Sequence, residues 1–208
     1  MGECILCYGK SGSGKSRSLI NFGEEEICLI NTIGKRLPFK KKFKYTYQSD
    51  SIPKIMDALG KMPTKTAVID DAGYLLTNAF MREHSSPKSG GSAFAMYNNI
   101  ADSFWNLLTF IKQQLPEDAL VYIIMHEDTS DYGETKLRTI GKLLSEKVCI
   151  EGMVTVALRC MKLGDKYVFR TQTDGSDISK SPEGMFEAVI DNDLKAVDAA
   201  IREYYEMA

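Results

Sequence analysis

The chain has 208 residues, of which 44% are hydrophobic and 26% are charged, and its net charge is −2 at neutral pH. This size and apolar fraction predict a single domain, residues 1–208, around one sizeable core. The near-neutral charge means that an anionic partner would need a local basic patch. No apolar run reaches the roughly 18–20 residues of a membrane span, so we expect no membrane contact. The five cysteines are best explained as small buried side chains in a reduced cytosolic protein.

Strands and helices alternate through the first 125 residues. Buried strands are predicted at residues 3–8, 27–31, 66–69 and 119–125. Helices are predicted at residues 15–22, 52–59 and 97–115. Residues 82–92 are rich in Ser, Gly, Lys and Pro and predict a loop.

The last third of the chain begins with a polar loop at residues 126–141 and a helical turn at 142–147. Residues 154–161 and 167–171 predict a β-hairpin. A loop at 173–182 and a helix at 193–205, started by Asp191 and Asn192, complete the chain. Alternation of strands and helices predicts an α/β fold with a mostly parallel sheet flanked by helices and a C-terminal β-hairpin.

Residues 9–16 read G-K-S-G-S-G-K-S, which matches the Walker A pattern G-x-x-x-x-G-K-[ST] between a strand and a helix. Glycines let backbone N–H groups converge on a phosphate, and a helix N-terminus favours an anion. Lys15 would reach the β- and γ-phosphates of ATP, and Ser16 would bind Mg²⁺. A chance glycine-rich turn is the alternative. The predicted nucleotide-binding residues are Gly9, Lys10, Ser11, Gly12, Ser13, Gly14, Lys15, Ser16 and Arg17.

Two acids end the strand at residues 66–69, as in a Walker B pattern. Asp70 would share the Mg²⁺ ion with Ser16. Asp71 would act as the base that activates water, although it could instead be a solvated or helix-capping acid.

The strand at 119–125 is also followed by polar residues. His126 is the candidate sensor of the γ-phosphate, with a capping or surface histidine as the alternative. Glu127 is a second candidate base. The candidate catalytic residues are therefore Lys15, Asp71, His126 and Glu127.

Residues 35–44 are basic and interleaved with aromatic residues, a composition that suits single-stranded nucleic acid. The alternative is an exposed charged segment whose aromatic side chains turn into the core. Together with the loop at 82–92, this segment supplies the DNA-binding candidates Lys40, Lys41, Lys42, Lys44, Arg82 and Lys88. Candidates for a cation that acts across a subunit interface are Arg138, Lys142, Arg170 and Lys180, each of which could also be a surface charge.

The chain resembles the small phage-encoded P-loop ATPases described as AAA domains or core-only RecA-like recombination proteins. The shared Walker patterns are common to many proteins, whereas T-Q-T-D-G at 171–175 and K-S-P-E-G-M-F at 180–186 are more specific. The resemblance implies a RecA-like P-loop fold and ATP- and Mg²⁺-dependent handling of single-stranded DNA. It also implies a homo-oligomer, ring or filament, in the bacterial host cytoplasm, with a single-strand binding protein as a possible partner.

One departure from RecA concerns its catalytic glutamate. Residues 31–34 read N-T-I-G where RecA carries that glutamate, so the expected base moves to Asp71. Two other functions stay open: a nucleoside or nucleotide kinase, and an ATP-binding switch or loader without significant turnover. The chain lacks the arginine cluster that a kinase lid often carries.

Overall fold

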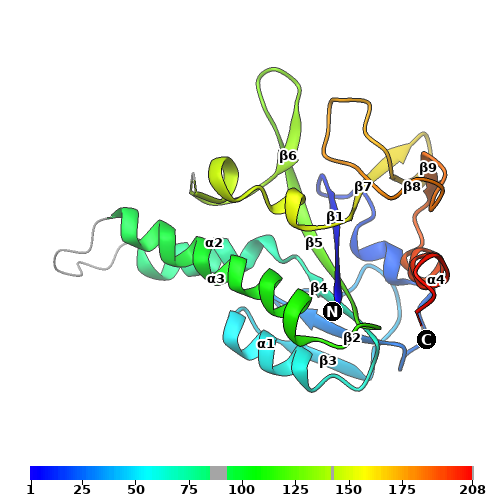
Figure 1. Ribbon diagram of the computed structural model, residues 1–208, viewed down its shortest axis with the longest axis horizontal. Coiled ribbons are helices and arrows are strands. Elements are labelled where there is room, and N and C mark those ends of the chain that lie inside the picture. The colour runs from blue at the N-terminus through cyan, green and yellow to red at the C-terminus, as the bar shows by residue number, and fades with distance from the viewer. Residues whose placement is uncertain (85–92, 142, 208) are drawn as a thin grey trace.

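A nine-stranded sheet forms the centre of the protein, whose computed structural model describes residues 1–84, 93–141 and 143–207. The strands follow the order β3-β2-β4-β5-β1-β7-β8-β9, and β6 pairs with β5 outside this order. Figure 1 shows how they are arranged. Their bounds are β1 (Glu3–Gly9), β2 (Ile27–Asn31), β3 (Tyr45–Gln48), β4 (Thr66–Asp70), β5 (Leu120–Thr129), β6 (Thr135–Leu137), β7 (Val156–Leu163), β8 (Lys166–Arg170) and β9 (Val189–Asp191).

Parallel pairing dominates the sheet, as the sequence predicts. β1 pairs in parallel with β5 and β7, β4 with β2 and β5, and β2 with β3. The pairs β5–β6, β7–β8 and β8–β9 are antiparallel, and β7–β8 is the predicted hairpin. Because β5 lies between β1 and β4, the carboxyl ends of these three strands meet at one edge of the sheet.

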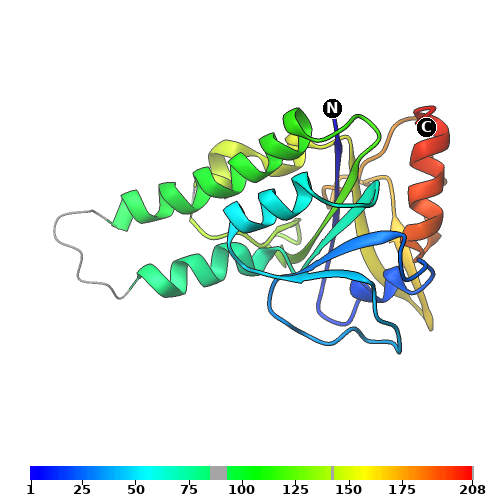
Figure 2. The same ribbon diagram turned by 90° about the horizontal axis from the view of Figure 1, so that it is seen from below.

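Helices cover both faces of the sheet. The larger layer consists of α1 (Ile52–Gly60), α2 (Gly73–Glu83) and α3 (Ala93–Gln114), and the opposite face is covered by α4 (Leu194–Tyr204) and the 3-10 helix η1 (Ser16–Leu19). Side chains alternate along β1, so that Leu6 faces the first layer and Ile5 the second. In Figure 2, α2 and α3 extend side by side away from the sheet, and α4 lies on the far side of the strands.

The predicted helix at 15–22 is much shorter in the structure, where only Ser16–Leu19 forms a 3-10 turn. The Ser18 hydroxyl donates a hydrogen bond of 2.5 Å to the carbonyl oxygen of Lys15. Serine side chains compete in this way with the backbone hydrogen bonds of a longer helix.

The predicted loop at 126–141 is also different. β5 continues to Thr129 and pairs with β6, with Glu127 opposite Leu137, so this segment is largely a hairpin. The sequence did not predict α2, β3 or β9. The predicted helix at 193–205 is confirmed as α4, although its cap is Asp193 rather than Asp191 or Asn192. Among the helices of the described residues, none is long and apolar enough to cross a membrane.

Candidate functional site

The turn between β1 and η1 depends on glycine at two places. A Cβ atom on Gly9 would lie 2.5 Å from the carbonyl oxygen of Cys160 and 2.6 Å from Ser13 Oγ. Gly14 has a φ of 100°, and a Cβ atom there would lie 2.7 Å from Cδ1 of Tyr167. Larger residues would therefore displace the turn from the strands that surround it.

Lys15 lies under this turn rather than in solvent, with 6% of its surface exposed. Its Nζ donates hydrogen bonds to the carbonyl oxygens of Gly9, at 2.9 Å, and Lys10, at 2.7 Å. Nζ is also 3.5 Å from Nδ1 of His126. Burial lowers the pKa of the Lys15 ammonium. The structure thus brings together Lys15 and His126, two of the predicted catalytic residues.

Ser16 and Asp70 meet across the gap between the turn and β4. Ser16 Oγ donates a hydrogen bond of 3.0 Å to Asp70 Oδ1, and Asp70 is 5% exposed. Burial raises the pKa of Asp70 to about 6, and the neighbouring charge of Asp71 acts in the same direction. The pair predicted to share a metal ion is therefore in direct contact.

Asp71 occupies an unusual backbone conformation, with a φ of 57°. Aspartate is one of the few residues other than glycine that adopt this left-handed region. The Thr32 hydroxyl lies 2.9 Å and 3.0 Å from the carbonyl oxygens of Asp70 and Asp71, to which it donates. The buried Asp71 carboxylate forms an ion pair with Lys35, and its Oδ1 lies 3.4 Å from His126 Nε2.

His126 therefore lies between two predicted catalytic groups, with Nδ1 toward Lys15 and Nε2 toward Asp71. Burial lowers the pKa of His126, and the positive charge of Lys15 lowers it further. The imidazole is accordingly neutral at pH 7, so one ring nitrogen can donate a hydrogen bond and the other can accept one.

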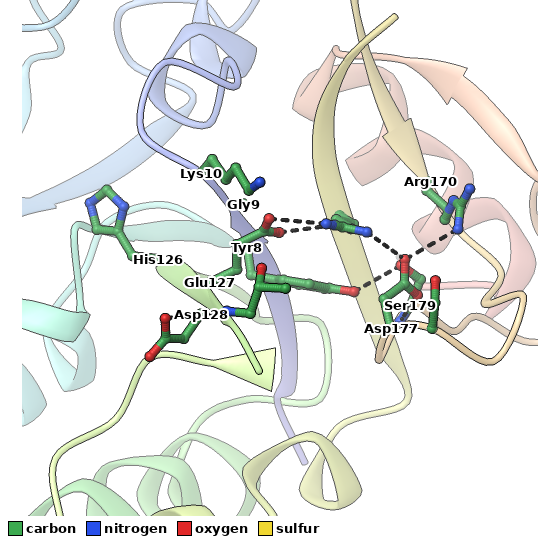
Figure 3. Close-up of polar contacts among 12 residues, drawn as sticks. Tyr8, Gly9, Lys10, His126, Glu127, Asp128, Arg170, Asp177 and Ser179 are labelled. Carbon is green, nitrogen blue, oxygen red and sulfur yellow. Dashed lines mark hydrogen bonds and ion pairs between the residues drawn. The ribbon is translucent and has the colours of Figure 1, made fainter. Parts of the chain in front are cut away.

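Glu127 points to the opposite side of β5 from His126, as Figure 3 shows. Its carboxylate receives two hydrogen bonds from Arg159, at 2.9 Å and 3.0 Å. Arg159 also forms an ion pair of 3.2 Å with the buried Asp177. Glu127 lines a separate pocket of about 320 Å³ behind the turn, together with Lys10 and Ser13. The structure therefore does not bring Glu127 together with Asp70 and Asp71.

A cleft of about 540 Å³ opens in front of the turn. Its wall includes Lys15, Ser16, Asp71 and His126, together with the predicted nucleotide-binding residues Ser11, Gly12, Gly14 and Arg17. Flat and apolar side chains complete it: Ile20, Pro38, Phe39 and Tyr167. The Arg17 guanidinium lies 5.1 Å from the centre of the Tyr167 ring. The cleft thus combines cations, acids and apolar surface.

The DNA-binding candidates divide into two groups. Lys41 Nζ donates to the carbonyl oxygens of Ile20 and Phe22, Lys44 pairs with Glu25 at 3.1 Å, and Arg82 pairs with Asp50. Lys40 and Lys42 are exposed and make no ion pair with a described residue, while Lys88 lies outside the described residues.

The aromatic residues of the same segment mostly turn inward. Phe43 is only 5% exposed, whereas Tyr47 is 43% exposed. Phe39 packs against the core cluster on the η1 and α4 face of the sheet. The alternative of an exposed charged segment with inward-facing aromatic residues describes Phe39 and Phe43, whereas Tyr47 follows this segment in β3 and is exposed.

Two of the four candidates for a cation acting between subunits, Arg138 and Arg170, form ion pairs within the chain. Arg170 pairs with Asp174 at 2.8 Å and with Asp177 at 3.4 Å. Arg138 lies 3.7 Å from Asp128, and its side chain is 65% exposed. Lys180 is half-buried and bridges to Ala157 through the backbone, and Lys142 lies outside the described residues.

Sequence reasoning missed Lys35, Arg159 and Tyr167 as members of the site or its surroundings. Lys35 follows β2, the neighbour of β4, and this adjacency is the one signal that could have placed it beside Asp71. A scan of models of known protein families finds no match to this chain, and a search of curated protein sequences finds no significant match.

Proposed function

We propose that the protein is a P-loop ATPase that binds ATP in this cleft and hydrolyses it. The observation that carries the proposal is the convergence of five side chains at one end of three strands. Lys15 is 3.5 Å from His126, His126 is 3.4 Å from Asp71, and Ser16 is hydrogen-bonded to Asp70 at 3.0 Å. Lysine, serine and aspartate are the residue types with which P-loop enzymes bind a triphosphate and its metal ion.

The residues fit Mg²⁺ that arrives with the nucleotide. Ser16 and Asp70 would hold the ion, which usually takes one or two carboxylate ligands and keeps water and phosphate oxygens for the rest. The described residues contain no group of three or more His, Cys, Asp or Glu side chains that could hold a metal ion without other ligands. When bound, Mg²⁺ supplies positive charge that neutralises the phosphate oxygens.

The reaction would use the groups around Asp71. The oxygen of a water molecule attacks the γ-phosphorus while Asp71 accepts a proton of that water, and the bond from the γ-phosphorus to the β–γ bridging oxygen breaks. The products are ADP and inorganic phosphate. Lys15 stabilises the charge on the phosphate oxygens, and His126 contributes a hydrogen bond at the same end of the cleft.

The side chains that line the cleft are also suited to binding the nucleoside part of a nucleotide. Tyr167 and Phe39 provide aromatic faces, and Ile20 adds apolar surface. Aromatic rings stack on the faces of nucleobases without reading their edges. We assign adenine on the strength of the resemblance to phage ATPases.

The same resemblance extends the proposal to single-stranded DNA as the partner in phage recombination or replication, and to assembly as a homo-oligomer. Lys40, Lys42 and Tyr47 support DNA binding because they are exposed cations and an exposed ring that lie close together in the chain. Phosphate neutralisation by lysine makes such binding sensitive to salt.

The test is the rate of phosphate release from ATP by the wild type and by Lys15→Ala. Loss of the charged contact to phosphate should nearly abolish turnover. Lys61→Ala is the matched control, because Lys61 is an exposed lysine at the end of α1 that pairs with Asp57 at 2.6 Å. Normal hydrolysis by Lys15→Ala would show that the site assignment is wrong.

The same assay also tests the proposed interaction with single-stranded DNA. Single-stranded DNA should raise the wild-type rate, and the increase should shrink steeply as the salt concentration rises. An unchanged rate at every salt concentration would contradict a role in DNA handling but not the ATPase activity.

A further inference from the structure

The side chain of Lys35 reaches the cleft from the segment after β2. Its ammonium group forms an ion pair with Asp71. The Lys35 side chain is 51% exposed, whereas that of Asp71 is only 3% exposed. Lys35 is also part of the cleft wall, together with Lys15 and His126. A buried carboxylate is thus joined to a cation that still contacts solvent in the cleft.

The backbone around Lys35 is held firmly in place. Asn31 donates a hydrogen bond of 2.7 Å to the carbonyl oxygen of Lys35 and accepts one of 3.2 Å from its N–H group. Gly34 has a φ of 70°, and a Cβ atom there would lie 2.5 Å from Nε2 of Gln48. Asn31 itself pairs with Asp70 in the sheet, so Lys35 is anchored to the strand that carries the two acids.

The orientation and charge of the Asp71 carboxylate depend on its neighbours because the side chain is buried. Its backbone is left-handed at a φ of 57°, and its carboxylate is held by Lys35 and His126. Of these two partners, Lys35 is the one that forms an ion pair with the carboxylate as a lysine ammonium, whereas burial disfavours the charged form of His126. An ionised carboxylate in a buried site is costly unless a charged partner balances it.

We propose that Lys35 is a positioning residue for ATP hydrolysis, which holds the Asp71 carboxylate oriented toward the attacking water through their ion pair. The proposal rests on the ATPase function proposed above. It assigns Lys35 a role through Asp71 rather than as a group that touches the nucleotide. A misplacement of about 1 Å in a catalytic group can lower a rate on the order of 100-fold.

The first test compares kcat and KM for the wild type and Lys35→Met. We expect kcat to fall roughly 10- to 100-fold, because the base loses its orientation. KM and the dissociation constant of a fluorescent ATP analogue should change less than about threefold, since binding in the ground state is kept. Lys61→Met, which removes an exposed lysine–aspartate pair, should match the wild type. A normal kcat for Lys35→Met, or a loss confined to KM, would overturn the proposal.

The second test asks whether Lys35 acts through Asp71. In a double-mutant cycle, adding Lys35→Met to Asp71→Asn should cause little further loss in kcat, because the group that Lys35 positions is already gone. Independent, multiplicative losses would mean that Lys35 acts on another group and would contradict the proposal.

Lys35→Arg guards the test against simple unfolding. Arginine keeps the charge, so this variant should fold with a wild-type melting temperature and recover part of the kcat that Lys35→Met loses. An arginine variant that is folded but as slow as the methionine variant would overturn the proposal. No turnover by the wild type would overturn the ATPase function and this inference together, whereas a wild-type-like Lys35→Met beside an inactive Asp71→Asn would overturn the inference alone.

Discussion

Asp70 is a carboxylic acid in a site that disfavours its ionised form. Burial and the adjacent Asp71 raise its pKa to about 6 from the ordinary 3.8. The folded protein therefore binds this proton more tightly than the unfolded chain does. The stabilising effect of protonation is full below about pH 4 and is lost as the pH rises to about 6. Above that range the ionised carboxylate destabilises the metal-free fold.

Asp70→Asn should consequently stabilise the metal-free protein at pH 8. With the pKa raised from 3.8 to about 6, the gain in the free energy of unfolding is on the order of 3 kcal/mol. At pH 4 the gain should nearly disappear, because Asp70 is then protonated in the folded protein. Urea denaturation with a chelator present measures both values. Asp57→Asn is the control, since Asp57 is 64% exposed. A stabilisation of equal size at both pH values would contradict the shifted pKa.

The basic segment at residues 35–44 has one lysine that binds the neighbouring backbone and others that face solvent. Lys41 turns inward, and its ammonium group donates to the carbonyl oxygens of Ile20 and Phe22 beyond the end of η1. These carbonyl groups follow a helix of only four residues, so they lack backbone partners of a longer helix. Lys42, one residue further along, is exposed.

Lys41→Met should therefore lower the free energy of unfolding by roughly 1–3 kcal/mol, the range for hydrogen bonds from a charged donor. Lys42→Met should leave it unchanged within about 0.5 kcal/mol, as expected for an exposed residue. Chemical denaturation of the two variants at one pH gives the comparison. Equal stability of both variants would show that the Lys41 contacts do not hold the segment to η1.

Only part of the candidate site can be predicted from the sequence. Short patterns at strand ends identify Ser16 and Asp70 as candidate site residues, and the structure brings these two side chains into contact. The ion pair between Lys35 and Asp71 depends on β2 lying next to β4, which no local pattern encodes. The opposite directions of His126 and Glu127 follow from the continuation of β5 to Thr129, in a segment whose polar residues predict a loop.

The strands β3 and β9 and the short length of η1 could not be predicted from local sequence patterns. β3 has mostly exposed side chains, so it lacks the apolar run that identifies a buried strand. β9 has only three residues. The helix after the turn is short because local side-chain hydrogen bonds compete with it, although the surrounding pattern favours a longer one.

A buried ionic network joins segments that are far apart in the chain. Arg159 on β7 contacts Glu127 on β5 and Asp177 in the segment after β8. Arg170 adds a second cation to Asp177, at 3.4 Å. The side chains of Glu127 and Asp177 are 2% and 0% exposed, so each depends on these cations for charge balance.

Arg159→Met should destabilise the protein by roughly 3–5 kcal/mol, since it leaves two buried carboxylates with one partly exposed arginine. Arg170→Met should cost less, because Asp177 keeps Arg159. Adding Glu127→Gln to Arg159→Met should recover part of the loss by removing one unbalanced charge. Urea denaturation of the single and double variants measures these effects. An Arg159→Met protein as stable as the wild type would show that the network contributes nothing to the fold.

The alternation of side chains along β5 separates the two adjacent residues His126 and Glu127. The imidazole belongs to the cleft, while the next carboxylate belongs to the ionic network on the reverse side. A shift of this strand along its own axis would consequently disturb both environments at once. Inserting one residue just before His126 would place the imidazole on the Arg159 side of the strand, whereas deleting one there would turn the Glu127 carboxylate toward Lys15.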